Sequence, residues 1–392
     1  MPQSFEHGGL YPALLKELPE DLQAELAKIR AFLAPHTQRA YLVGGAVRDL
    51  LRRHIEGKEI PITDLDIEVY GIEPERFDEL MKELGAKGVG KSFFVYKYRA
   101  NIDISLPRIE SKVAPGHRGF AVRLARDEKE ASVRRDFRLN ALMLDIFTGR
   151  LLDFWGGVED IKRRRIRIID AEKFKEDSLR VLRGVQFSAR FGYRIDERSL
   201  AVMEQIDLSD LSKERIFWEF EKLFRGDFPH YGLYHLLRLG IDRKIFGLRF
   251  KRFFTAARKM VRAVRDGERH LKKFYFLYIF ANEAHKSYTL FLDALAAPRE
   301  YYRAFRDQKA LPKHPTERYV AAMALRFAIR DFLGNFDVRI KKIARRIGVW
   351  EEKFAAVTPK ELLAEGFGGE ALGKELRRRN LAAIKARFKG RE

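Results

Sequence analysis

Two aspartates spaced two residues apart, Asp64 and Asp66, are the residues of this sequence best suited to chemistry. They lie in the stretch TDLDIEVYG, where acidic and apolar residues alternate as they do in a β-strand. Side chains two residues apart on a strand share a face, so both carboxylates would point to the same side, together with Glu68. Mg²⁺ takes oxygen ligands and usually shares its coordination shell with substrate phosphates. The pattern predicts either a magnesium site or the solvent-facing side of an ordinary amphipathic strand.

A glycine pair upstream favours the magnesium site. In YLVGGAVRDLL a short apolar strand turns through Gly44 and Gly45 into a helix that carries Arg48. Such a turn is typical of phosphate binding, because backbone N–H groups at a helix start favour anions. A phosphate site beside a magnesium site indicates phosphoryl transfer, in which metal ions stabilise the attacking and leaving oxygens.

A third acid, Asp103, lies between two isoleucines in the second of two adjacent predicted strands, FFVYKYRA and NIDISLP. Its side chain faces opposite to the isoleucines, so Asp103 is either a third ligand beside Asp64 and Asp66 or a solvent-facing residue. Residues 107–130, which follow, are rich in glycine, proline and charge, and this composition predicts a mobile loop over the site.

An arginine pair followed by an acid, Arg134, Arg135 and Asp136, suits a nucleoside triphosphate. Guanidinium groups match phosphate oxygens, and a carboxylate can accept a hydrogen bond from a sugar hydroxyl. The alternative is an ordinary surface pair of arginines.

A further acid and arginine lie in EDSLRVLRGVQFSARFG, which predicts a helix opened by Glu176 and Asp177. Arg180 and Arg183 follow at helical spacing, so Asp177 and both arginines share a face. The acid can accept from the amino group of cytosine or adenine while the arginine donates to the ring nitrogen, whereas uracil and guanine present the reverse order. The alternative is a simple ion pair worth a few tenths of a kcal/mol.

The 392-residue chain has a formal net charge of +21 that is unevenly distributed. Residues 1–150 contain 24 basic and 23 acidic residues, whereas residues 151–392 contain 53 and 33. Such a basic surface attracts polyanions; it favours nucleic acid over an anionic membrane, and over a thermophile-like charged surface, which is usually near charge balance. The sequence has no cysteine, which excludes disulfides, thiolate zinc sites and thiol catalysis.

The sequence also bears on where the protein acts. No apolar run is long enough to cross a membrane, and MPQSFEHGGLYPALLKELPEDLQ lacks a basic start followed by an apolar core. We therefore expect no secretory signal and a cytoplasmic protein.

The elements that must position these residues form two regions. Residues 10–34 and 73–85 carry apolar residues at helical spacing and predict helices beside the strands. Beyond residue 200 the pattern predicts helices throughout, in which aromatic stripes form core rather than base-stacking surfaces.

Five motifs together resemble, in order and spacing, those of the class II tRNA nucleotidyltransferases, the CCA-adding enzymes, with their relatives the bacterial poly(A) polymerases. The motifs are GGAVRD, TDLDIEVYG, RRDFRLNAL, EDSLRVLRGVQFSARFG and ERIFWEFEKLF. The resemblance implies an α+β protein with a polymerase-beta-like nucleotidyltransferase head, a mixed sheet with helices, followed by an all-helical neck, body and tail. It places the catalytic head at residues 1–150, a base-recognising neck at 151–225, and a tRNA-binding body and tail at 226–392.

The resemblance also implies site residues and a cofactor. Mg²⁺ would be held by the catalytic acids Asp64 and Asp66, with Asp103 as a possible third acid. The implied nucleotide-binding residues are Gly44, Gly45, Arg48, Arg135, Asp136, Asp177, Arg180 and Arg183.

The implied activity is template-independent addition of C and A from CTP and ATP to the 3′ end of tRNA. The alternatives are an enzyme that adds only CC or only A, a poly(A) polymerase, and a non-catalytic RNA-binding protein. The motifs leave open the product, the third acid, the switch from C to A and the oligomeric state.

Overall fold

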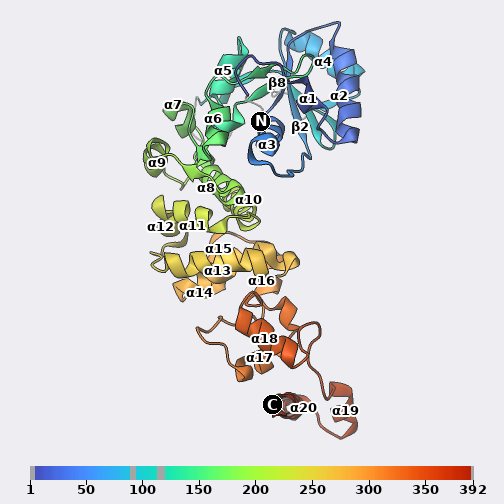
Figure 1. Ribbon diagram of the computed structural model, residues 1–392, viewed down its shortest axis with the longest axis vertical. Helices are drawn as coiled ribbons and strands as arrows, with labels where there is room; N and C mark the ends of the chain where they lie inside the picture. Colours follow the sequence, from blue (N-terminus) through green and yellow to red (C-terminus); the bar gives the residue numbers. More distant parts are fainter. Residues whose placement is uncertain (1–4, 89–93, 113–119, 390–392) are drawn as a thin grey trace. The chain divides into compact units, whose positions relative to one another are not determined.

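The structure is a computed structural model that describes residues 5–88, 94–112 and 120–389 (Figure 1). The chain divides into two compact units. The first comprises Met1–Gly184 with Tyr193–Asp210, and the second comprises Val185–Gly192 with Leu211–Glu392. The finer division into a head, a neck, and a body with tail stays a prediction.

The described part of the first unit contains a seven-stranded mixed sheet, which agrees with the predicted α+β class. Strands β2 and β5 pair in parallel, and the other neighbours pair antiparallel. In spatial order the strands are β3 (Lys87–Gly88), β4 (Val95–Arg99), β5 (Ile102–Ser105), β2 (Leu65–Val69), β1 (Ala40–Val43), β8 (Met143–Asp145) and β9 (Leu151–Leu152). The antiparallel pair β4 and β5 confirms the strand pair predicted around Asp103.

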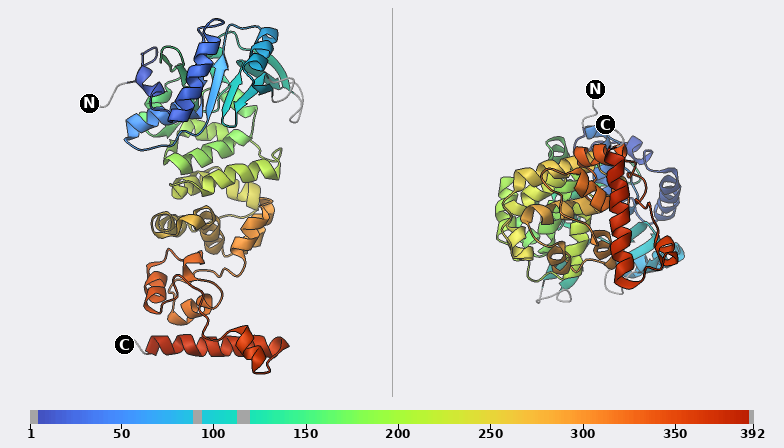
Figure 2. Two further views of the ribbon diagram at one scale, coloured as in Figure 1. Left: turned by 90° about the vertical axis from the view of Figure 1, so that its right-hand side faces the viewer. Right: turned by 90° about the horizontal axis from the view of Figure 1, so that it is seen from below.

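The strand register gives the sheet one apolar face and one face that carries acids. Asp66 of β2 lies opposite Asp103 of β5, and residues paired in this way project to the same side. The apolar residues between the acids project to the other side, where α2 (Glu20–Leu33) and α4 (Pro74–Glu83) lie (Figure 2). Phe77 of α4 meets Tyr96 of β4 edge-on there, with ring centroids 5.5 Å apart. The helices therefore seal one face and leave the acidic face for the site.

Proline and local capping divide two of the predicted helices. Residues 10–34 form α1 (Pro12–Leu15) and α2, because Pro19 fits the start of α2 but not a helix interior. Glu176 and Asp177 lie in the turn between α7 (Ala171–Lys175) and α8 (Leu179–Phe191), rather than inside a helix. The first unit also contains α3 (Gly45–Glu56), α5 (Glu128–Val133), η1 (Arg138–Asn140), α6 (Gly157–Lys162), α9 (Glu197–Glu204), and the paired strands β10 (Arg165–Ile166) and β11 (Arg194–Ile195).

The loop predicted at residues 107–130 is instead mainly a hairpin, so its predicted structure is wrong. Strands β6 (Arg108–Lys112) and β7 (Phe120–Leu124) pair antiparallel, and α5 follows. Most of the glycine and proline of this stretch lies in the connection at 113–119, which is outside the described residues. Composition averaged over the whole stretch hid the two arms that pair.

Helices make up the described part of the second unit, as predicted beyond residue 200 (Figure 2). They are α10 (Lys213–Phe224), α11 (Pro229–Arg238), α12 (Ile241–Phe246), α13 (Phe253–Asp266), η2 (Arg269–Leu271), α14 (Lys272–Ala284), α15 (Tyr288–Ala294), α16 (Arg299–Phe305), α17 (Glu317–Ala324), η3 (Ile329–Asp331), α18 (Val338–Arg346), α19 (Pro359–Ala364) and α20 (Gly369–Lys389).

Aromatic side chains form much of the core of this unit, which confirms the prediction that the aromatic stripes are core. The rings of Phe250 and Phe280 stack with centroids 4.5 Å apart, and those of Phe224 and Phe276 lie 5.4 Å apart. All four side chains are buried. In the part of the chain that the structure describes, every helix is too short or too polar to span a lipid bilayer.

Candidate functional site

Three of the sequence motifs meet at Gly44, where β1 ends. The backbone angles of Gly44, φ 68° and ψ −126°, are strained for any residue with a Cβ. A Cβ built there would lie 3.7 Å from Nη1 of Arg135 and 3.8 Å from Oδ2 of Asp66. The missing side chain therefore leaves room beside a guanidinium and a carboxylate, on the acid-bearing face of the sheet.

The predicted acids are neighbours on this face. Asp66 is exposed, and Asp64, also exposed, immediately precedes β2 and accepts a hydrogen bond from Oγ1 of Thr63 at 2.7 Å. Asp103 lies beside Asp66 in the register and forms an ion pair with Lys97 at 3.4 Å. The strand pattern thus predicted the shared face of Asp66 and Asp103.

The electrostatics of Asp66 suit a bound cation. Desolvation by the surrounding protein raises the pKa of Asp66, Arg135 opposes this rise, and the negative charges of Asp64, Asp103 and Glu68 add to it. A cation between the acids would remove this repulsion.

Within the described residues, no group of three or more His, Cys, Asp or Glu is arranged to hold a metal ion. Mg²⁺ is often bound through one or two carboxylates, with water and substrate phosphates completing its shell. The pair Asp64 and Asp66 therefore fits a cation that is shared with a bound triphosphate.

Glu68, which shares the strand face of Asp66, contacts both members of the predicted arginine pair. It is 2% exposed. Its Oε1 accepts hydrogen bonds from Nη2 of Arg134 at 2.8 Å and Nη2 of Arg135 at 2.6 Å, and its Oε2 accepts from the hydroxyl of Tyr70 at 2.9 Å. Burial alone would raise the pKa of Glu68, but the two guanidinium groups and the hydroxyl hold it below its ordinary value. The arginine pair is thus not an ordinary surface pair.

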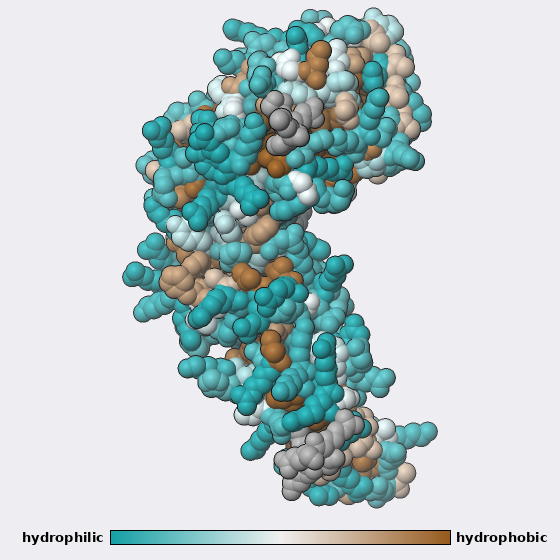
Figure 3. Space-filling model, in the orientation of Figure 1, coloured by the Kyte–Doolittle hydropathy of each residue, from teal (hydrophilic) through white to brown (hydrophobic). Residues whose placement is uncertain are grey.

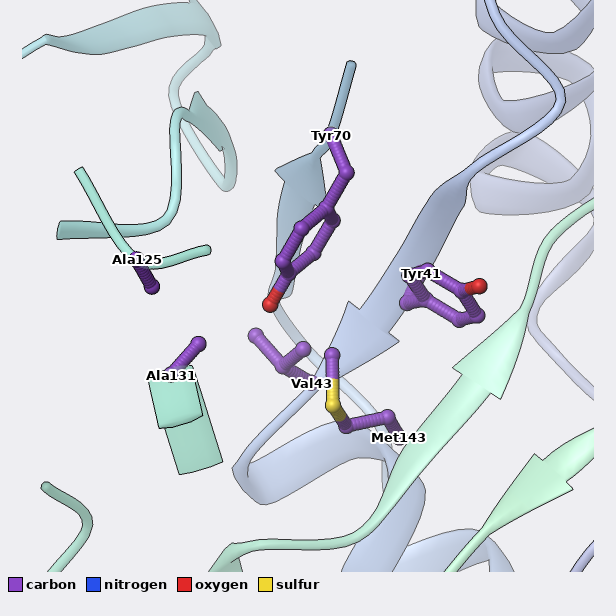
Figure 4. Close-up of a cluster of buried hydrophobic side chains, with 6 residues drawn as sticks. All are labelled: Tyr41, Val43, Tyr70, Ala125, Ala131 and Met143. Carbon is purple, nitrogen blue, oxygen red and sulfur yellow. The ribbon is translucent and has the colours of Figure 1, made fainter. Parts of the chain in front are cut away.

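Packing fixes the tyrosine that holds Glu68. The ring of Tyr70 meets that of Tyr41 edge-on, with centroids 5.6 Å apart. Both rings belong to a buried apolar cluster next to Glu68 on the sheet (Figure 4), which comprises Tyr41, Val43, Tyr70, Ala125, Ala131 and Met143. The cluster therefore gives the Tyr70 hydroxyl a fixed position.

A second polar network joins three elements behind the glycine turn. Arg48 is 5% exposed; its Nε and Nη2 donate to Asp49, and its Nη1 donates to Oδ1 of Asn140 at 2.7 Å. Nδ2 of Asn140 donates to Oδ1 of Asp136 at 2.8 Å, and Nε of Arg183 donates to Oδ2 of Asp136 at 2.7 Å. This chain of contacts links α3, η1 and α8.

The network gives two predicted nucleotide-binding residues a structural function in addition to the predicted one. Arg48 and Asp136 hold elements together, and their contacts to triphosphate and ribose stay predictions. The sequence offered one signal for Asn140: it is a single amide in the apolar run LNALML, where a buried amide needs partners.

Arg180 is tied to two backbone segments. Its Nη1 donates to the carbonyl of Lys173 at 2.6 Å, and its Nη2 donates to the carbonyl of Arg134 at 2.8 Å. A guanidinium has five N–H donors, so these bonds leave donors for a ligand. Oδ1 of Asp177 accepts from the backbone N–H of Leu179 at 3.2 Å. Recognition of a base by Asp177 and Arg180 stays a prediction.

Comparison with known families matches the regions that carry these residues. Residues 40–167 match the Poly A polymerase head domain, and residues 192–246 match the family described as "Probable RNA and SrmB- binding site of polymerase A". The chain is 33% identical over 234 residues to the CCA-adding enzyme of Lactococcus lactis subsp. lactis (strain IL1403), and 38% identical over 199 residues to the Multifunctional CCA protein of Tolumonas auensis. Over these regions the chain is similar to CCA-adding enzymes and to the head domain of poly A polymerases.

The similarity to known proteins is partial in sequence and nearly complete in fold. The two alignments cover 58% and 48% of this chain, and 56% and 46% of the relatives, so the chain spans about half the length of the curated relatives it matches. The Thermotoga maritima CCA-adding enzyme complexed with tRNA_CCA has a TM-score of 0.68 and 21% identity, over 97% of this chain and 95% of that chain. The Bacillus stearothermophilus CCA-adding enzyme in complex with CTP has a TM-score of 0.64 and 22% identity, over 94% of each chain. The chain therefore has the fold of these two solved structures, a head with a mixed sheet followed by helices.

We expect Gly44→Ala to weaken CTP binding by about tenfold, because the added methyl group enters the gap between Arg135 and Asp66. Backbone strain should also destabilise the protein by about 1–3 kcal/mol. Calorimetric titration with CTP and thermal denaturation measure the two effects. The matched control is Gly57→Ala, which also has positive φ (62°) but has no atom within 4 Å of its Cβ position. Equal loss of CTP affinity in both variants would contradict the assignment of Gly44 to the site.

Proposed function

We propose that this protein adds C and A nucleotides from CTP and ATP to the 3′ end of tRNA without a template. The observation that carries the proposal is that Asp66 and Arg135 both lie within 4 Å of the Cβ position of Gly44. A candidate cation ligand, a candidate phosphate-binding guanidinium and a turn without a side chain are thus next to one another. The names of the relatives support the choice of substrate, since they are CCA-adding enzymes.

In the proposed reaction the 3′-hydroxyl of the RNA attacks the α-phosphate of the nucleotide, and pyrophosphate leaves. Arg135 donates to phosphate oxygens, and the turn at Gly44 and Gly45 lets the triphosphate approach the backbone. Asp64 and Asp66 would hold Mg²⁺, which supplies neutralisation of the phosphate charge and activation of the hydroxyl when bound. Asp103 is the candidate third acid. Rate enhancement then comes mainly from positioning and preorganised charge.

The choice of base would lie with Asp177 and Arg180. The carboxylate accepts from the amino group of cytosine or adenine, and a remaining N–H of Arg180 donates to the ring nitrogen. The contacts of Arg180 to the carbonyls of Lys173 and Arg134 hold its guanidinium in one orientation, which supports this function.

The second unit would bind the RNA. The chain beyond residue 150 carries nearly all of the net positive charge, and the face of the second unit shown in Figure 3 is largely hydrophilic. A cavity of about 280 Å³ lies between α17 and α20, with Lys309, Lys353 and Arg377 among its lining residues. Within the described residues these three cations form no ion pair, whereas Arg378 and Arg379 on the same helix pair with Glu375. Cations without partners are available to phosphates, so we place an RNA contact here.

The product ladder tests the proposed function directly. Purified protein, Mg²⁺ and a tRNA that lacks its terminal CCA are incubated with CTP, with ATP, and with both. We expect extension by two nucleotides with CTP alone and by three with both, resolved on a sequencing gel. A ladder that stops at CC with ATP present, or a long adenylate tail, would instead assign one of the related activities.

The matched control for the ladder is Asp66→Asn. It should abolish extension, because the amide is a weaker cation ligand than the carboxylate, while tRNA affinity stays within about twofold. Extension at the wild-type rate would refute the assignment of Asp66 as a metal ligand. If the wild-type protein does not bind tRNA, the proposal that the second unit binds RNA is refuted.

Arg180→Ala should lower the preference for CTP over UTP, measured as the ratio of kcat/KM values, by about tenfold or more. The reason is that the remaining carboxylate accepts hydrogen bonds without a paired donor. The control is Arg198→Ala, an exposed arginine on α9. Unchanged selectivity in Arg180→Ala would contradict base recognition by Arg180 and leave only its structural contacts to two backbone carbonyls.

Replacement of two cavity cations by alanine, Lys353→Ala with Arg377→Ala, should weaken tRNA binding by about tenfold at moderate salt and reduce the dependence of log Kd on log salt by about 1–2. The control pair, Lys374→Ala with Arg378→Ala, removes two cations of α20 that are already paired with Glu370 and Glu375. Filter binding across a salt series measures both. Equal effects of the two pairs would show that only total charge matters.

A further inference from the structure

One oxygen of Glu68 is shared between two neighbouring guanidinium groups. Oε1 accepts from Nη2 of both Arg134 and Arg135, while Oε2 is held by Tyr70. Neither oxygen is exposed enough to serve as a ligand for the substrate, since the residue is 2% exposed. Glu68 therefore acts on the site through the two arginines.

For Arg135, this contact sets the direction of the free edge. A guanidinium is a rigid planar fork, so fixing Nη2 also fixes where Nη1 points. Nη1 lies 3.7 Å from the Cβ position of Gly44, which is itself 3.8 Å from Oδ2 of Asp66. Glu68 thus aims the remaining donors of Arg135 at the space where the proposed triphosphate would lie.

For Arg134, the same contact reaches the base-recognition residue. The side chain of Arg134 is held by Glu68, and its backbone carbonyl accepts from Nη2 of Arg180 at 2.8 Å. A single buried carboxylate on the strand that carries Asp66 is therefore connected through one residue to Arg180.

The negative charge of Glu68 also affects where the two arginines can form ion pairs. Two guanidinium groups share the one carboxylate of Glu68, and the guanidinium of Arg135 also lies near Asp66, since Nη1 of Arg135 and Oδ2 of Asp66 are 3.7 and 3.8 Å from the same Cβ position at Gly44. Without the negative charge of Glu68, the arginines would gain most by turning to Asp66, where they would compete with a cation.

We infer that Glu68 is a positioning residue that keeps Arg134 and Arg135 from pairing with the metal-binding acids and aims Arg135 at the nucleotide. This inference rests on the proposed function, because it assigns the nucleotide and the cation to that site. It adds a residue on which both cation binding and the orientation of the arginines depend.

The test is Glu68→Gln, which keeps the shape and one acceptor oxygen but removes the charge. We expect the affinity for Mg²⁺ with CTP, measured by calorimetry without RNA, to fall by about tenfold, and the half-saturating Mg²⁺ concentration to rise by about fivefold. Affinity for tRNA should stay within about twofold. Because binding is measured without transfer, these shifts test Glu68 even where the product ladder fails.

The matched control is Glu56→Gln. Glu56 is also a buried carboxylate that accepts from an arginine, Arg52, and a tyrosine, Tyr193, and its side chain is 2% exposed. Both variants should lose thermal stability, but Glu56→Gln should keep the wild-type Mg²⁺ and CTP dependence. Wild-type dependence in Glu68→Gln, or equal shifts in both variants, would overturn the inference.

A milder variant keeps the test decisive where Glu68→Gln fails to fold. Tyr70→Phe removes the hydrogen bond to Oε2 and leaves both arginine contacts in place. A looser carboxylate should raise the half-saturating Mg²⁺ concentration by about twofold without changing tRNA affinity. An unchanged Mg²⁺ dependence in a folded Tyr70→Phe protein would count against positioning by Glu68.

Discussion

The arrangement of the first unit depends on the hydrogen bonds that the buried carboxylate of Asp136 accepts from Asn140 and Arg183. Burial alone would raise its pKa, but Arg183 and Asn140 hold it below its ordinary value. An unpaired charge at this depth costs several kcal/mol, so the donors must stay in place whenever the unit is folded. Because Asn140 also accepts from Arg48, the requirement extends to the helix that starts at the glycine turn. The geometry of the turn is thus enforced by charge as well as by packing.

Two polar networks hold different parts of the structure around this turn. The network of Asp136 lies behind it and joins α3, η1 and α8, while Glu68 orders the arginines on the open face. The bond from Arg180 to the carbonyl of Arg134 connects the two, since Arg180 and Arg183 belong to the same helix. Preorganised donors of this kind are effective in phosphoryl transfer, because they need no rearrangement when charge develops.

The sequence allowed prediction of the features that depend on local spacing. Alternation placed Asp66 and Asp103 on one face, and the glycine pair marked the turn. The functions of Glu68 and Asn140 could not be predicted, because their arginine partners lie 66 and 92 residues away in the chain and are set by tertiary structure. The hairpin at 108–124 was missed because composition does not distinguish a loop from two short arms that pair. Helix boundaries were missed where capping decides them, as between α7 and α8.

The parallel pairing of β2 with β5 limits how the lengths of related chains can vary. Asp66 and Asp103 are neighbours only in the present register, and side chains alternate between faces with a period of two. A single-residue insertion inside β2 would reverse the faces of the residues on one side of it, so that Asp66 would no longer project to the same side as both Glu68 and Asp103. Length variation among homologous chains should therefore be excluded from these two strands and accumulate in the connections between them, so that the spacing of the acids serves as a marker for alignment where overall identity is low.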